Sequence, residues 1–505
     1  MGIRVEDQTR STAGVTKLFP ASRWDWSFIC VGVFAVAAAI FRASKAGGFP
    51  LWDDEYPHVF AAKSLLNVGR PLLPSGQPYT RALPFTWLVS VSFRLFGVSE
   101  LSARLPSIIL GSLLVLFVFL LGRRYLGTAT GVLAAALVAI DPINAPLMII
   151  SRMYSLLALL FLVTAFGLFE SIRHVRKGSL SVWYTMLAIV AGLMALWTQL
   201  LVVFLVPGII AYLLVMGRRD MRFGKTRRGR VEITSAMFLL LASALVYILQ
   251  GGIINEAPAV HDISYWYFSD ILLRNAWPAV IFFVLGLWAA ISRENDFALF
   301  IACVAVGDFA VQSLLFPSWA SARYLAQAMP PFYLLAAYGA AGLVRRKWVR
   351  PAAVMALVLV TLILALGSHI GDAYFAAPRY ALASGFAGTT GAYGKAGVIV
   401  STDPLASVYY LGRAGYWLRE TRYSFYVISS SKGPLHFYSG ALLISDHTTL
   451  RRLMLSTKSG WIFLDGRAGN LSSSTIDVIR KQCVLVARDR NRLKIYRWEQ
   501  PSVSR

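Results

Sequence analysis

Long apolar runs, separated by short basic segments, constrain the fold of this chain more than any other feature. Of its 505 residues, 57% are hydrophobic and the mean hydropathy is +0.60, which is too apolar for a soluble globular protein. Several runs approach the ~20 residues that a helix needs to cross a bilayer, so the sequence predicts a polytopic α-helical membrane protein with about 11 spans. The expected spans lie near residues 25–43, 102–121, 127–142, 148–169, 181–197, 199–216, 233–252, 272–291, 297–316, 324–343 and 352–371.

Basic residues indicate which side of the membrane each loop faces. The formal net charge is +24, and Lys and Arg gather in the N-terminal segment and in alternate loops. By the positive-inside rule these segments are cytoplasmic, so we expect a cytoplasmic N-terminus. Their charge suits contact with anionic membrane lipids, and no nucleic-acid partner is expected. The segments on the opposite side are residues 44–100, 253–271, 317–323 and the C-terminal tail.

The composition changes after the last expected span, near residue 371. Short β-branched runs alternate there with helical patterns, which predicts a soluble α/β domain. We therefore expect a transmembrane domain over residues 1–371 and an extracytoplasmic, periplasmic domain over residues 372–505. The second domain contains 18 Lys and Arg against 8 Asp and Glu, which favours an acidic partner. Its expected strands lie at residues 397–401, 441–445, 461–465, 484–488 and 493–498.

Three adjacent acids, Asp53-Asp54-Glu55, stand in the first outward loop, just after the first apolar run. Carboxylates beside a span are costly unless water, a cation or chemistry uses them. One interpretation is a general base that takes a proton from an acceptor hydroxyl, with His58 on the same helix face as Asp54. The other interpretation is a helix N-cap at Asp54 with solvated acids beside it.

The same loop predicts two helices that lie at the membrane surface. The first follows the acidic triplet, runs to about Val68 and ends at Gly69. The second covers residues 84–96 and ends at Gly97.

Several segments of the first outward loop, and one late patch, resemble the glycosyltransferase C superfamily. Within it, they are most similar to the branch of protein O-mannosyltransferases and lipid A aminoarabinose transferases. The resemblance implies a GT-C type fold and the transfer of a sugar from a polyprenyl-phosphate carrier outside the cytoplasm. The segments are Asp54-Glu55, Pro78-Tyr79, Pro84, Phe96-Gly97-Val98-Ser99-Glu100, Ser102-Ala103-Arg104-Leu105-Pro106-Ser107, Arg323-Tyr324-Leu325 and Pro330-Pro331.

The resemblance also implies roles for single residues. Asp54 matches the base that activates the acceptor, and Glu55 matches its neighbour. Asp53 stays an alternative base, and Asp141 is a secondary acidic candidate at a later outward turn. Arg104 matches the Arg of the family's Ala-Arg-Leu-Pro segment.

The leaving group of such a transfer is a lipid phosphate, and fixed Arg donors stabilise its charge in a water-poor site. Arg at a span end also snorkels to lipid headgroups, so both roles are open for each candidate. Tyr154 could bind the phosphate or anchor its helix, and Tyr324 follows one of the candidate Arg residues. The candidates near outward ends of spans are Arg81, Arg104, Arg152 and Arg323.

Metal binding is not assigned to any residue. Aminoarabinose transferases carry a Glu-Lys-Pro segment where this chain has Thr80-Arg81-Ala82, so the acid that contributes to their metal site is missing. The sequence assigns no cofactor, and the binding of a divalent cation stays an alternative. His261, beside Asp262 in the 253–271 loop, is either a ligand or substrate contact or a solvated residue.

These features predict a polyprenyl-phosphate-dependent glycosyltransferase of a bacterial inner membrane. Its donor is a polyprenyl-phosphate-linked sugar, and its acceptor is a glycolipid, a glycan or a protein. The alternative is a transporter or flippase for a lipid-linked glycan. Transporters usually show internal repeats and polar residues near the midplane, whereas the polar residues of this chain gather in outward loops.

Overall fold

A computed structural model of the chain describes residues 26–47, 50–219, 265–315, 321–344, 397–413, 415–420, 426–488 and 493–500. Two expected spans, 233–252 and 352–371, lie outside these residues. So do His261 and the expected domain boundary near residue 371.

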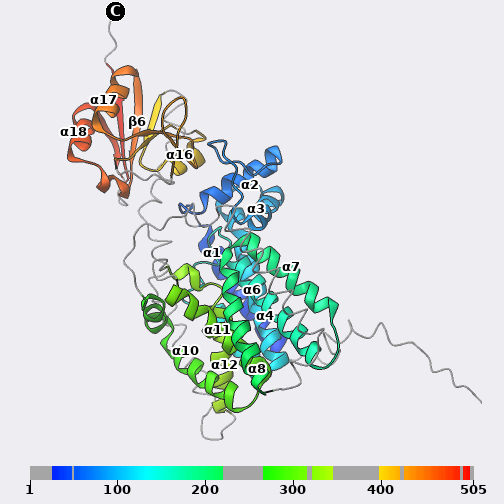
Figure 1. Cartoon of the computed structure of the whole chain (residues 1–505). Helices are drawn as coiled ribbons and strands as arrows, with labels where there is room; N and C mark the ends of the chain where they lie inside the picture. Colours follow the sequence, from blue (N-terminus) through cyan, green and yellow to red (C-terminus); the bar gives the residue numbers. More distant parts are fainter. Residues whose placement is uncertain are drawn as a thin grey trace, which may run out of the picture.

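The first part of the chain forms a bundle of apolar helices (Figure 1). Five of them, α1, α4, α6, α10 and α11, are long and apolar enough to cross a membrane by length and composition. The polytopic helical fold is therefore confirmed. The helices of the bundle are α1 (Trp26–Ala46), α4 (Glu100–Tyr125), α5 (Thr128–Ala139), α6 (Tyr154–Arg176), α7 (Val182–Thr198), η1 (Leu200–Phe204), α8 (Leu205–Arg219), α10 (Tyr267–Ser292), α11 (Asp296–Leu315) and α12 (Met329–Val344).

One helix of the bundle begins later than its sequence pattern predicts. The span expected at 148–169 starts at Tyr154, and residues 140–153 fold as a buried series of turns. Pro142 and Pro146 lack the N–H that a helix interior requires. The Asp141 carboxylate also accepts the backbone N–H of Ile143 at 2.9 Å, which favours a turn over a helix.

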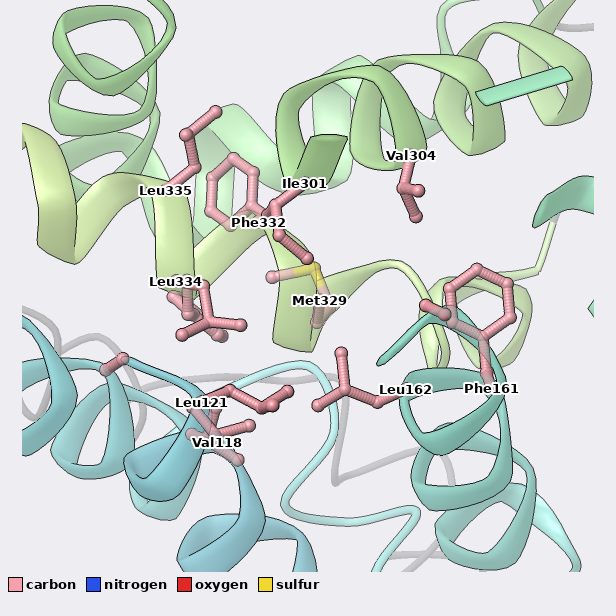
Figure 2. Close-up of a cluster of buried hydrophobic side chains, with 14 of the residues drawn as sticks. Val118, Leu121, Phe161, Leu162, Ile301, Val304, Met329, Phe332, Leu334 and Leu335 are labelled. Atoms are coloured by element: carbon pink, nitrogen blue, oxygen red, sulfur yellow. The ribbon is translucent and has the colours of Figure 1, made fainter. Parts of the chain in front are cut away.

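Apolar side chains from four helices meet in the centre of the bundle (Figure 2). Val118 of α4 and Phe161 of α6 face Ile301 of α11 and Met329 of α12 there. All four are buried, and dense packing of this kind is sensitive to small changes in volume.

Glycines let neighbouring helices of the bundle approach closely, as is common where membrane helices pack. Gly286 of α10 and Gly339 of α12 lie against each other. A Cβ on Gly286 would stand 2.1 Å from the Leu335 carbonyl oxygen, and one on Gly339 would stand 3.0 Å from the Gly286 Cα.

The first outward loop carries two helices, α2 (Tyr56–Val68) and α3 (Leu83–Phe96), as predicted. Helix α2 ends at Gly69 in the left-handed conformation, with φ 72°, which glycine adopts without strain. The expected N-cap at Asp54 is wrong. The N-cap position of α2 is Glu55, and its side chain makes no capping hydrogen bond because the carboxylate is used elsewhere.

The C-terminal domain is an α/β domain, as predicted. Among the described residues of this domain, eight strands form one mixed sheet in the order β3-β4-β5-β2-β1-β6-β8-β7, with parallel pairing in the centre and antiparallel pairing at both ends. The five expected strands are present, and three short ones, β2, β3 and β4, were not expected. The strands are β1 (Val398–Ser401), β2 (Tyr416–Leu418), β3 (Val427–Ile428), β4 (Leu435–His436), β5 (Leu442–Ile444), β6 (Ser459–Leu464), β7 (Val484–Arg488) and β8 (Lys494–Glu499); the helices are α16 (Pro404–Leu411), α17 (His447–Ser456) and α18 (Ser473–Gln482).

The C-terminal domain packs on the first outward loop (Figure 1). The ring centroid of Tyr409 in α16 lies 5.9 Å from that of Tyr56 in α2. The hydroxyl of Tyr410 donates to the Glu100 carboxylate at the start of α4, at 2.6 Å. The loop therefore lies between the bundle and the sheet domain.

Replacing Gly286 by Ala should destabilise the bundle by about 1–3 kcal/mol, because the new methyl group meets a backbone oxygen of α12 that cannot move away cheaply. Thermal unfolding of the protein in detergent micelles measures the effect. Gly32→Ala in α1 is the matched control, since a Cβ there meets nothing within 4 Å. Equal melting temperatures of the two variants would contradict the close α10–α12 contact.

Candidate active site

Glu55 is the centre of the hydrogen bonding that holds the first outward loop. Its side chain is 0% exposed. One carboxylate oxygen accepts from Nε of Arg104 at 2.9 Å and from the backbone N–H of Ser151 at 2.6 Å. The other accepts from Nη2 of Arg104 and from the backbone N–H of Trp52, both at 2.7 Å. Four donors thus satisfy the carboxylate, and Glu55 is held too deeply to act on a substrate.

Arg104 is buried with Glu55 and is 2% exposed. Besides the carboxylate, its guanidinium donates to the carbonyl oxygens of Ala46 at 2.6 Å and Pro50 at 2.7 Å. These contacts join the end of α1, the loop and the start of α4. We therefore reassign Arg104 from the lipid phosphate to the support of Glu55.

Asp54, the residue before Glu55, lies toward solvent between two arginines. Its side chain is 35% exposed, and its carboxylate lies 2.7 Å from Nη1 of Arg323 and 3.8 Å from Nη2 of Arg152. Arg152 also donates to the Asp54 carbonyl oxygen at 2.9 Å. The two arginines come from positions 98 and 269 residues further along the chain, so the fold brings three separate segments to one point.

Each of these two arginines lies beside an aromatic ring. The Arg152 guanidinium lies 5.7 Å from the ring centroid of Tyr154, and that of Arg323 lies 5.2 Å from the ring centroid of Tyr324. Cation–π contacts of this length hold a guanidinium in place. Tyr154 is itself buried, which suits the anchoring role.

His58 is enclosed within the first outward loop. It is 0% exposed, with Nδ1 2.9 Å from the Thr86 hydroxyl and Nε2 3.4 Å from the Tyr79 hydroxyl. Burial, with the nearby Arg152 and then Arg81, holds the pKa of His58 well below its ordinary value. A neutral, fully enclosed ring indicates a structural role.

The other candidates from the sequence differ in their exposure to solvent. Asp53 is half-buried and Arg81 is exposed in the same loop. Asp141 is 0% exposed and accepts the Tyr333 hydroxyl at 3.0 Å, so it is a buried acid inside the bundle. Within the described part of the chain, no three His, Cys, Asp or Glu side chains come together as a metal-ligand set.

One residue near Asp54 was not predicted from the sequence. Tyr438 of the C-terminal domain belongs to the turn between β4 and β5, and its surroundings include Arg81, Asp54 and Arg152. Burial raises the pKa of Tyr438 to about 12, although the nearby Arg81 acts to lower it. No local pattern marks this tyrosine, because its place depends on how the domain packs on the loop.

Part of the chain matches a known protein family. Residues 80–248 match the model of the dolichyl-phosphate-mannose-protein mannosyltransferases. A search of curated protein sequences finds no significant match.

Solved structures with a similar fold cover almost the whole chain. ArnT from Cupriavidus metallidurans in the apo state matches with a TM-score of 0.65 and 15% identity, over 94% of this chain and 98% of ArnT. Its structure bound to undecaprenyl phosphate matches with a TM-score of 0.61 and 14% identity, over 92% of this chain and 97% of ArnT.

A second group of similar structures is archaeal. The oligosaccharyltransferase AglB from Archaeoglobus fulgidus, in complex with an inhibitory peptide and a dolichol-phosphate, matches with a TM-score of 0.58 and 10% identity. The match covers 88% of this chain and 70% of AglB. These comparisons confirm the GT-C type of fold that the sequence segments predict.

Replacing Glu55 by Gln should destabilise the protein by about 3–5 kcal/mol, because the Arg104 guanidinium would remain buried without its counter-charge. Thermal unfolding in detergent gives the loss, and limited proteolysis shows whether the first outward loop opens. Asp53→Asn, two residues earlier and half-buried, is the control, with an expected change within about 0.5 kcal/mol. A melting temperature of the Glu55 variant equal to that of the control would refute the central role of the pair.

Proposed function

We propose a specific reaction for this chain. Its fold and its match to a mannosyltransferase family indicate a glycosyltransferase of the GT-C superfamily that uses a lipid-linked donor. It transfers a sugar from a polyprenyl phosphate to a hydroxyl group of an acceptor outside the cytoplasm. Asp54 is the general base, and Arg152 and Arg323 bind the phosphate of the donor. The contact of Asp54 with both arginines is the observation that carries this assignment.

The charge of the site suits an anionic donor. One carboxylate stands between two guanidinium groups, at 2.7 and 3.8 Å, so the three side chains together carry a net positive charge. Attraction between charges at such distances is worth several kcal/mol where the environment is partly shielded from water, about 4 kcal/mol at 4 Å for an effective dielectric constant of about 20. A lipid phosphate can therefore replace the carboxylate as the partner of the arginines.

That replacement leaves Asp54 available for the acceptor. As the acceptor oxygen forms its bond to the anomeric carbon, its proton passes to the Asp54 carboxylate. The bond between the anomeric carbon and the phosphate oxygen breaks, and the electron pair remains on the polyprenyl phosphate. Arg152 and Arg323 stabilise that charge in the transition state because they are held in place beforehand.

The remaining residues have supporting or secondary roles in this proposal. Arg81, exposed on the loop, contacts the substrates from the open side, and Tyr324 holds Arg323. Asp53 is the alternative base, one residue away. Asp141 is too deeply buried to reach the acceptor, so we assign it to the support of the bundle.

The orientation of the protein follows from the same reaction. The first outward loop, the site and the C-terminal domain lie together at one end of the bundle (Figure 1). We place this end on the periplasmic side of a bacterial inner membrane, with the basic loops in the cytoplasm. The fold of enzymes with lipid-linked donors favours this function over a transporter or flippase.

Asp54→Asn should lower the rate of sugar transfer by about 10²- to 10⁴-fold, the usual contribution of a general base. It should leave the binding of undecaprenyl phosphate intact, because both arginines remain. Transfer is measured with labelled polyprenyl-phosphate sugars and purified protein in lipid nanodiscs. Asp53→Asn should retain most of the activity. The opposite pattern would make Asp53 the base.

Arg323→Ala should weaken the binding of undecaprenyl phosphate about 10- to 100-fold, since a hydrogen bond to a charged group contributes about 1.5–3 kcal/mol. Binding is measured by titration of the purified protein with undecaprenyl phosphate. Arg274→Ala is the control, because Arg274 forms an exposed ion pair with Asp270 on α10, and such pairs contribute little. Equal affinities of the two variants would exclude Arg323 from the phosphate site.

A further inference from the structure

The C-terminal domain is fixed on the first outward loop by several independent contacts. Tyr409 packs on Tyr56 and on Phe60, with ring centroids 5.9 and 6.4 Å apart. The Tyr410 hydroxyl donates to Glu100 at 2.6 Å. These contacts combine the packing of aromatic rings with a charge-assisted hydrogen bond. Together they give the domain one defined position on the loop.

The turn between β4 and β5 is a further contact, and it lies beside the site. Gly440 has a φ of +72°, and a Cβ there would stand only 3.0 Å from the Ser75 Cα. The turn is rigid, because the His436 ring lies 2.8 Å from the Ser439 hydroxyl and accepts the Ser439 N–H at 3.2 Å. Tyr438 is thus held against the loop that carries Asp54.

Tyr438 belongs to a cluster of aromatic side chains in the domain. Its ring centroid lies 5.0 Å from that of Phe437, 5.8 Å from that of Tyr426 and 5.9 Å from that of His436. The cluster holds the Tyr438 ring half-buried at the boundary with the loop. The charged groups that act on its hydroxyl are Arg81, Asp54 and Arg152.

We propose that Tyr438 is the contribution of the C-terminal domain to the acceptor subsite, where it and Arg81 position an anionic glycolipid with one hydroxyl group facing Asp54. This inference rests on the proposed function and deepens it. The site is then built from two domains. The bundle supplies Arg152 and Arg323 for the donor, and the sheet domain supplies Tyr438 for the acceptor.

The chemistry of the two residues suits such an acceptor. The face of a tyrosine ring packs on the apolar face of a sugar, and its hydroxyl can donate to or accept from a sugar hydroxyl. Arg81 presents a guanidinium that can bind a phosphate or carboxylate with two hydrogen bonds. The excess of basic residues in the domain attracts the same class of acceptor.

The test uses the full-length protein in lipid nanodiscs with polyprenyl-phosphate-linked sugars as donors. Three acceptor probes are compared: lipid A with its phosphates, lipid A without phosphates, and a peptide containing Ser and Thr. Tyr438→Ala should raise the KM for phosphorylated lipid A at least 10-fold and leave the KM for the donor and the affinity for undecaprenyl phosphate unchanged. Tyr438→Phe, which keeps the ring, should give a smaller rise.

Arg81→Gln should remove the preference for phosphorylated over dephosphorylated lipid A. Tyr416→Phe is the matched control, because Tyr416 lies in β2 of the same domain but packs in the separate cluster around Val400. It should leave the KM values, the affinity for undecaprenyl phosphate and the acceptor preference unchanged. An unchanged KM for lipid A in Tyr438→Ala would overturn the inference. Transfer of sugar to the peptide as efficient as transfer to phosphorylated lipid A would also overturn it. Absence of transfer to all three probes by the unsubstituted protein would instead refute the proposed function.

Discussion

The buried ion pair of Glu55 and Arg104 is the interaction on which the outward end of this protein depends. It joins the end of the first helix, the start of α4 and the turn before Arg152 through hydrogen bonds of 2.6 to 2.9 Å. Two buried charges are stable only if they satisfy each other completely. The pair meets this condition, and so it fixes the backbone from which the neighbouring Asp54 extends.

Arg152 and Arg323 reach Asp54 from segments that are far apart in the chain, and each also contacts an aromatic ring. In the proposed reaction, such a site is preorganised before the donor arrives, and preorganisation is the main source of electrostatic stabilisation in enzymes. The turn between β4 and β5 of the sheet domain lies against the loop that carries Asp54. Donor and acceptor would thus be bound by different parts of the fold that meet at one carboxylate.

Local patterns in the sequence were sufficient to predict the helices of the first outward loop, since Gly69 and Gly97 end them as expected. The hydropathy of the long apolar runs likewise predicted that they form a bundle of helices. The role of Arg104 could not be predicted, because an Arg near a span end has the same sequence pattern whether it binds a phosphate or a buried Glu. Tyr438 was missed for a similar reason, as its position depends on contacts between domains.

Two pairs of adjacent residues face each other across the site. The backbone of Ser151 donates to Glu55, and the side chain of Arg152 contacts Asp54. In each pair, one residue forms the buried hydrogen bond, and its neighbour forms the ion pair between Arg152 and Asp54. The alignment of the two segments therefore decides which carboxylate is enclosed and which is open. Inserting or deleting a single residue in either segment would shift these contacts out of register without changing any side chain, so the length of both segments is constrained together with their composition.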